Sequence, residues 1–276
     1  MKKKLAINCA LCNLSQVSQE VLNEYESILI NAATVITSPR SRALMARLPV
    51  KINAASTVDV PDGAELSQHN GSFEIKPGPP PEPPVVLVVN GRLVIHPGAR
   101  EALQGYPSIS VNGEALYPQG LSDALGRMKV NGASYAYPDE AILLKKNAVI
   151  ERVFVLRAKE GLYFSPRSII MTDPELDVKA LTDKGARLQA SRVYIANALL
   201  EAVLPLINDD AQVHVIPDGF AFLQGDQTLS GQLLRSQGHS LYILGDLHIP
   251  QDASQALEQL EGLQVCGQIS LPEALE

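Results

Sequence analysis

The sequence has no tryptophan, few other aromatic residues and a modest share of charged residues. Among its 276 residues, aromatic side chains make up 5% and charged side chains 19%, and the formal net charge is −7. Scarce aromatic residues disfavour a stacking platform for single-stranded nucleic acid. Binding a polyanion also needs concentrated Lys and Arg, which this acidic composition does not favour. We therefore expect no nucleic-acid partner.

Cysteine is scarce too, and hydrophobic runs are short. Three cysteines do not make a disulfide framework and suit a reducing compartment. No apolar run approaches the roughly 20 residues that a membrane helix needs, so we expect no membrane association. The lysine-rich start followed by residues 5–14 imitates a signal peptide, but Asn8 and Asn13 interrupt the apolar stretch and no small-residue cleavage site follows. These features predict a cytoplasmic protein.

The common catalytic and cofactor motifs are missing. The patterns GxGxxG, GxxxxGK[ST] and GxSxG do not occur, and the histidines form no HExxH or other metal spacing. We therefore expect a non-enzymatic protein with no catalytic residue, no cofactor and no metal. His96 and His248 both come just before a proline, and we interpret them as partly exposed residues at strand ends. The other histidines are scattered: His69, His214 and His239.

What the sequence does contain is an internal repeat, in which apolar residues lead into Asn and a small residue. Ile7-Asn8-Cys9-Ala10 recurs 23 residues later at Ile30 and another 22 later at Ile52. Val89-Asn90-Gly91 likewise recurs 22 and then 19 residues further on, at Val111 and Val130. Substituted copies of the same template occupy residues 241–245 and 263–267.

A second apolar stretch follows each small residue and ends at a proline, after which apolar residues recur at helical spacing. Proline suits the first turn of a helix, where its missing N–H would have no partner. Asn and Gly both tolerate positive φ, so they suit a tight turn. Each unit is therefore expected to read strand, turn, strand and short helix. The prolines concerned are Pro61, Pro97, Pro118, Pro138, Pro250 and Pro272.

This pattern predicts an α/β repeat solenoid of roughly 22-residue units, with a parallel sheet on one face and short helices on the other. The register is poorer in the middle, where we expect first strands at residues 154–156, 169–171, 193–195 and 213–215. Residues 76–84, which read KPGPPPEPP, should form an extended connector or a loop, and docking of a proline-recognising domain is the alternative. They separate an N-terminal block, 1–75, from a C-terminal block, 85–276, that we expect to continue the first.

The segment Leu257-x-x-Leu260-x-x-Leu263-x-Val265 resembles a leucine-rich repeat, whose pattern is LxxLxxLxLxxNxL, and Leu103-x-x-Tyr106-x-x-Ile109 matches it more loosely. The chain also resembles uncharacterised bacterial leucine-rich proteins. The resemblance implies a curved stack with a parallel strand face and, commonly, a protein-binding role. Asn follows the second apolar residue directly and leucine is not dominant, which leaves a different α/β or β-solenoid open.

Cys9-Ala-Leu-Cys12 is the motif most suggestive of chemistry, because CxxC can be a redox pair or half of a zinc site. In the repeat, however, Cys9 takes the small-residue position of Ala32 and Ala54, and Cys12 aligns with the apolar Val35. We expect both to be small buried hydrophobic residues. Zinc would need two more ligands, and no second CxxC exists.

The repeated asparagines could be a polar binding track or could satisfy backbone groups inside the turn. Their regular spacing favours the structural interpretation, because buried amides and carbonyls need partners. Asp209-Asp210 is expected to be a solvated loop, and Cys266 stands where earlier units have Asn, with no role assigned. The asparagines are Asn8, Asn31, Asn53, Asn90, Asn112 and Asn131.

Extended repeat surfaces commonly bind other proteins, so the sequence predicts a protein-interaction scaffold of unknown partner. Two alternatives stay open. Stackable ends would allow end-to-end self-association into a structural assembly, because the last unit stops at residues 271–276 without its full helix. Thiol redox or metal chemistry at Cys9 and Cys12 is the other alternative.

Overall fold

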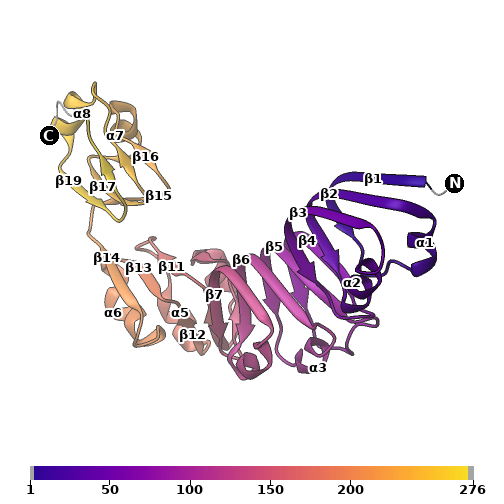
Figure 1. The fold of residues 1–276 in the computed structure, drawn as a ribbon. Coiled ribbons are helices and arrows are strands. Elements are labelled where there is room, and N and C mark those ends of the chain that lie inside the picture. The colour runs from indigo at the N-terminus through magenta and orange to yellow at the C-terminus, as the bar shows by residue number, and fades with distance from the viewer. Residues whose placement is uncertain (1–2, 273–276) are drawn as a thin grey trace. The chain divides into compact units, whose positions relative to one another are not determined.

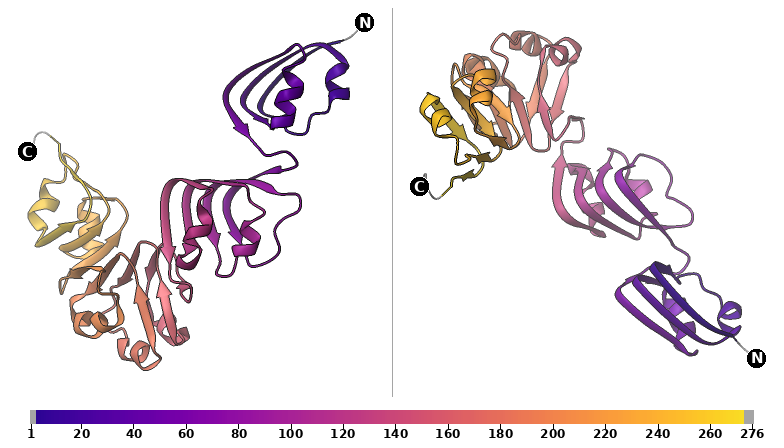
Figure 2. Two further views of the ribbon diagram at one scale, coloured as in Figure 1. Left: turned by 60° about the horizontal axis from the view of Figure 1, so that its bottom comes forward. Right: turned by 90° about the horizontal axis from the view of Figure 1, so that it is seen from above.

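A computed structural model describes residues 3–272 and shows an α/β protein whose strands pair in parallel (Figure 1). The chain folds into two compact units, and the boundary between them lies between Asp139 and Glu140. Figure 2 shows the strands of each sheet side by side, with the helical turns in the connections between them. None of the helices in the described range is long and apolar enough to cross a membrane.

The first sheet of the first unit has the order β1-β2-β3, built from Lys3–Asn13, Tyr25–Thr37 and Val50–Asp59. The predicted register is confirmed here, because Asn8 pairs with Asn31 and Asn31 with Asn53. Helices α1 (Gln19–Asn23) and α2 (Pro39–Met45) connect the strands. Helix α2 begins with Pro in its first turn, and the Ser38 hydroxyl accepts the Ser41 N–H, so its N-terminus is capped.

The second sheet of this unit has the order β4-β5-β6-β7. Equivalent residues again stack strand on strand, as in the row from Leu87 to Ile109 to Met128. These apolar side chains face a core that they share with α3 (Arg100–Leu103) and the 3₁₀ helix η1. The strands and η1 are Glu65–Ile75, Val85–Ile95, Ser108–Pro118, Met128–Tyr137 and, for η1, Gln119–Leu125.

The Asn-Gly pairs lie inside continuous strands, whereas the sequence predicts a turn between two strands. Gly91 and Gly113 have φ values of +144° and +142°, and they bend strands β5 and β6 in the middle. No non-glycine residue in the described range has positive φ, so the asparagines themselves stay extended. A Cβ on Gly113 would lie 2.1 Å from the Gly91 carbonyl oxygen, so stacked glycines let the bent strands remain paired.

Residues 76–84 form a loop between β4 and β5, which are paired strands of one sheet. The predicted division of the chain at this segment therefore falls inside a unit, and the observed division falls at Asp139. The loop lies against the α3 turn. A Cβ on Gly105 would be 2.2 Å from Pro81 Cδ, and one on Gly98 would be 3.4 Å from Pro77 Cγ.

The second unit begins with two narrow parallel sheets, of order β12-β10-β8 and β14-β13-β11-β9. The strands predicted at 169–171, 193–195 and 213–215 are confirmed as β11, β13 and β14. The strands are Ile142–Leu143 (β8), Asn147–Val149 (β9), Gly161–Phe164 (β10), Ser168–Met171 (β11), Ala186–Gln189 (β12), Arg192–Ala196 (β13) and Gln212–Ile216 (β14).

The strand predicted at residues 154–156 is wrong, because this stretch lies in helix α4 (Arg152–Arg157). Val155 and Ala158, three residues apart, are buried, while Val153 and Leu156 are exposed, which is a helical period and not the alternation of a strand. The other connections of these sheets hold α5 (Val178–Asp183), η2 (Asn197–Leu199), α6 (Leu200–Val203) and η3 (Leu204–Leu206).

The second unit continues with sheets β15-β17-β19 and β16-β18-β20. The predicted register of residues 241–245 and 263–267 is confirmed, because Leu241 of β17 pairs with Leu263 of β19. Helix α7 is Gly231–Gln237, and α8 is Ser254–Gln259. The strands are Ala221–Gln224 (β15), Gln227–Thr228 (β16), Ser240–Leu244 (β17), Leu247–His248 (β18), Gly262–Val265 (β19) and Ile269–Ser270 (β20).

Helices follow only some of the prolines that were expected to precede them. α3 follows Pro97, η1 follows Pro118 and α8 follows Pro250. After Pro61 and Pro138 the chain forms turns instead. Gly63 has a φ of +81° in a turn where the Ala64 N–H donates to the Pro61 carbonyl at 3.1 Å, just before β4 begins. The end of the last unit, residues 273–276, lies outside the described range.

Candidate functional site

Two rows of hydrogen-bonded asparagines cross the sheets of the first unit. In the first asparagine ladder, Asn31 and Asn53 each donate from Nδ2 to Oδ1 of the preceding asparagine at 2.8 Å. The second asparagine ladder contains Asn70, Asn90, Asn112 and Asn131, and each of its three bonds measures 2.9 Å. The amides thus bond mainly to one another, whereas the sequence analysis expected them to satisfy backbone groups.

Asn70 belongs to the second ladder although the repeat series in the sequence does not include it. Its neighbour His69 replaces the apolar residue found in the other copies, which hides the match. His69 is half-buried, and its ring lies 4.2 Å from that of Phe73. The Asn-Gly dipeptide 20 residues before Asn90 was the signal available in the sequence.

The two N-terminal cysteines differ in exposure. Cys9 is exposed, which corrects the expectation that it is buried, while Cys12 is buried as expected. Both keep the predicted register, opposite Ala32 and Val35. Burial raises the pKa of the Cys12 thiol, and the nearby Cys9 raises it further.

The histidines and the acidic pair do not converge on one place. His96 follows β5 and contacts Glu74 at 3.2 Å, and His248 ends β18 and contacts the Ser270 hydroxyl at 2.9 Å, so their positions at strand ends are confirmed. Asp209 and Asp210 lie in an exposed turn, as expected. No group of three or more His, Cys, Asp or Glu side chains suited to a metal gathers within residues 3–272.

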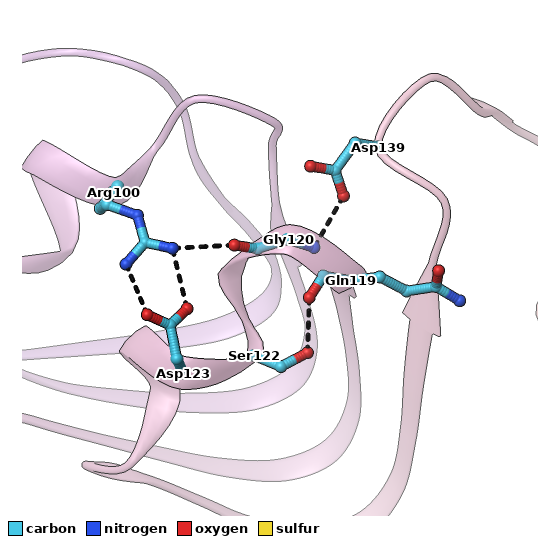
Figure 3. A network of polar contacts seen from close by, with 6 residues as sticks. All are labelled: Arg100, Gln119, Gly120, Ser122, Asp123 and Asp139. Atoms are coloured by element: carbon cyan, nitrogen blue, oxygen red, sulfur yellow. Dashed lines mark hydrogen bonds and ion pairs between the residues drawn. The ribbon is translucent and has the colours of Figure 1, made fainter.

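A polar network connects α3 and η1 in the first unit (Figure 3). The Arg100 guanidinium donates to both Asp123 carboxylate oxygens and to the Gly120 carbonyl, each at 2.8 Å. Asp139 in turn accepts the Gly120 N–H at 2.8 Å. Because these bonds join α3, η1 and the residue after β7, the network fastens neighbouring repeats together.

The most distinctive site is a cavity of about 400 Å³ in the second unit, between sheets β9–β14 and β15–β19. We call it the opposed-charge cleft. Its lining includes two arginines, two aspartates, a row of three glycines and one cysteine. These residues are Arg167, Arg192, Asp226, Asp246, Gly225, Gly245, Gly267 and Cys266, and the remaining polar lining is Asn147, Ser168, Tyr194 and Gln224.

One wall of the cleft is basic and follows from the register of the first sheet. Asn147, Ser168 and Arg192 stand opposite one another on β9, β11 and β13. The Ser168 hydroxyl donates to Asn147 Oδ1 at 2.9 Å. Arg167 and Arg192 are exposed, and neither forms an ion pair with a carboxylate of the described chain.

The opposite wall is acidic and repeats from one unit to the next. Asp226 Oδ1 accepts the Asp246 N–H at 2.9 Å, and Asp246 Oδ1 accepts the Gln268 N–H at 2.8 Å. Each aspartate follows a glycine: a Cβ on Gly245 would lie 2.4 Å from the Gly225 backbone, and Gly225 has a φ of +82°. Gly225, Gly245 and Gly267 take the place that the glycine of Asn-Gly has in the first unit, and the two aspartates come one residue later.

Tyr194 lines the cleft and packs against further aromatic side chains. Tyr194 and Tyr242 are buried, and their ring centroids lie 6.3 Å apart. The His214 ring stacks on that of Tyr194, with the ring centroids 4.8 Å apart. Burial lowers the pKa of His214, and the positive charge of Arg192 lowers it further to a smaller extent. The Cys266 thiol donates to the Tyr242 hydroxyl at 3.4 Å. Burial raises the pKa of both tyrosines, so both phenols are neutral near pH 7.

No pattern in the sequence predicted the opposed-charge cleft. Its residues come from six different strands and their ends, so no local motif carries it. Comparison with known proteins gives no match to a family model, to a curated protein or to a solved structure.

Proposed function

We propose that the chain is a protein-interaction scaffold, built as a repeat solenoid of leucine-rich-repeat character. The support is the strand-on-strand stacking of equivalent residues, which repeats one surface pattern along each sheet. Extended repetitive surfaces are what repeat proteins commonly use to bind partners.

The observation that carries the proposal is an open polar face on the sheet β4–β7. Gln68, Val88, Ser110 and Lys129 form one row of this face, polar except for Val88, two residues before the second asparagine ladder on each strand. Gln68 and Lys129 are exposed, and Ser110 is half-buried. Alternate residues of the same strands point into the core, so the polar row is on the outside of the sheet.

The test is cross-linked capture of partners from the cell that makes this protein, using three baits. Gln68→Arg places a long cation on the strand face, and Gln104→Arg makes the same change at an exposed position after α3. We expect a partner that the wild type and Gln104→Arg capture and that Gln68→Arg loses. If every captured protein binds all three baits equally, this face is not the interface.

A second candidate, self-association, is favoured by the edge strand β1. This strand has 11 residues and pairs with β2 alone among the described strands. Unpaired N–H and C=O groups on a long edge are a template for another strand. Light scattering at increasing protein concentration tests this candidate, because a constant monomer mass would remove it.

A further inference from the structure

We propose that the opposed-charge cleft binds a small ligand that carries both a carboxylate group and an ammonium group. This inference goes beyond the proposed scaffold function, because it concerns a small molecule and a different unit of the chain. It is based on the arrangement of charges around the cavity, on the donors and acceptors still available there, and on the space between them.

Charges of opposite sign line the cavity without neutralising each other. Arg167 and Arg192 lie on one wall, Asp226 and Asp246 on the other, and no Arg–Asp ion pair within 4.0 Å joins them in the described chain. Arg and carboxylate side chains that only hold a structure together meet directly, and frequently in a bidentate contact such as that of Arg100 and Asp123. The separation leaves about 400 Å³, within the range of small-molecule sites.

The basic wall offers more donors than its own structure uses. Each guanidinium has five N–H donors in a planar fork that matches a carboxylate. Asn147 uses its Oδ1 to accept from Ser168, which leaves its amide N–H groups as further donors. A ligand carboxylate would therefore find several directed hydrogen bonds on this side of the cleft.

The acidic wall keeps one carboxylate oxygen of each aspartate available. Oδ1 of Asp226 and Oδ1 of Asp246 accept backbone N–H groups, while no hydrogen bond within the described chain occupies either Oδ2. Gly225 and Gly245 precede these aspartates and present no side chain, so a ligand ammonium can approach closely. The two aspartates also disfavour a ligand with a second anionic group, because like charges repel.

The experiment uses the full chain and follows the Cys266 thiol, which is exposed and lines the cleft. Probes are glycine, 4-aminobutyrate and 6-aminohexanoate, which differ in the spacing of their two charges, with hexanoate and hexylamine as probes of one charge. Alkylation of Cys266 is measured by peptide mass spectrometry, and the exposed Cys9 of the other unit serves as internal control.

We expect at least one amino acid to slow Cys266 alkylation about fivefold without changing Cys9, at a concentration where hexanoate and hexylamine have no effect. Equal protection by hexanoate would overturn the proposal in favour of a simple anion site. No protection by any probe at millimolar concentration would also overturn it. Neither result bears on the capture experiment with Gln68→Arg.

Two variants test the two walls, each with a matched control. Asp246→Asn keeps the Oδ1 acceptor for the Gln268 N–H and removes only the negative charge. Arg192→Gln removes one guanidinium group. Loss of a charge-assisted hydrogen bond should weaken amino-acid binding about tenfold or more. Asp183→Asn and Arg187→Gln change exposed residues that do not line the cleft and should bind as the wild type does. Variants and controls that bind alike would overturn the assignment of the walls.

Discussion

The side chain of Asn112 donates a 2.9 Å hydrogen bond to Asn90 and accepts one of the same length from Asn131. Asn112 is therefore an interior rung of the second asparagine ladder, and Asn131 is its last rung. The two positions have the same residue type and similar exposure, so they differ mainly in the number of ladder bonds.

Replacing an interior rung should cost more stability than replacing the end. Asn112→Ala removes two ladder bonds and Asn131→Ala removes one. A solvent-accessible hydrogen bond contributes about 0.5 kcal/mol to stability, at the low end of the usual range. We therefore expect the free energy of unfolding to fall by about 1 kcal/mol in Asn112→Ala and by about 0.5 kcal/mol in Asn131→Ala. Urea denaturation of both variants checks this. Equal losses would mean that the ladder bonds contribute nothing.

Because the strands bend at stacked glycines, we expect replacement of one of these glycines by alanine to destabilise the fold strongly, and replacement of a glycine elsewhere to have little effect. Gly113→Ala would force a positive φ of +142° on alanine and place its Cβ 2.1 Å from Gly91 O. We expect a loss of about 3 kcal/mol or more. Gly126→Ala is the control, because its φ is −58° and nothing lies within 4 Å of the added Cβ, so its effect should stay within about 1 kcal/mol. Thermal unfolding distinguishes the two.

The environment of the Tyr137 hydroxyl leads us to expect a loss of stability at alkaline pH. Its hydroxyl donates to the Ile95 carbonyl at 2.6 Å, and burial, with a smaller effect of the Asp139 charge, raises its pKa to about 12. The unfolded pKa is about 10. Because the folded state holds this proton more tightly, the stabilisation is complete below pH 10 and is lost as the pH rises towards 12.

We therefore expect Tyr137→Phe to lower the free energy of unfolding at pH 8 by about 1 kcal/mol, with a smaller gap between variant and wild type near pH 11.5. Tyr135→Phe, two residues earlier and half-buried, is the control for the loss of one phenol. Urea denaturation at both pH values is the measurement. A gap that does not shrink would contradict the role of the Tyr137 proton.

The cysteines should differ in reactivity in the folded protein. Cys9 and Cys266 are exposed, while Cys12 is buried and has a raised pKa, so less of its reactive thiolate is present. With Ellman's reagent at pH 7.5 we expect Cys12 to react at least about tenfold more slowly than Cys9. Denatured protein, in which all three react, gives the reference. Fast reaction of Cys12 would favour the redox alternative for the CxxC pair.

The parts of the fold that recur in the sequence were predictable, and those that depend on packing between repeats were not. The register of Asn8, Asn31 and Asn53 follows from equal spacing, and the structure confirms it. The bend at Gly91 was interpreted as a turn, because a glycine with positive φ has the same sequence signature inside a strand as between strands. Residues 154–156 were assigned to a strand because a short apolar run does not reveal its period.

The opposed-charge cleft shows the same limit more clearly. Arg192 and Asp246 are 54 residues apart, and each follows the ordinary pattern of its own repeat. They line one cavity because the outer face of sheet β9–β14 packs through Tyr194 against Phe222 and Tyr242. The path of the chain between repeats decides which sheet faces pack together. No local sequence motif predicts that path.

Every amide after Asn70 in the second asparagine ladder donates towards the strand before it, so the row has a direction. Aspartate could replace Asn70, which accepts but does not donate within the row, whereas at Asn90 or Asn112 it would set two acceptor oxygens against each other. The second unit receives its ladder donors from the backbone, and there aspartate stands at positions 226 and 246. An amide side chain is needed at a bend where it must itself donate to the neighbouring strand. An aspartate is sufficient where the neighbouring strand supplies a backbone N–H donor.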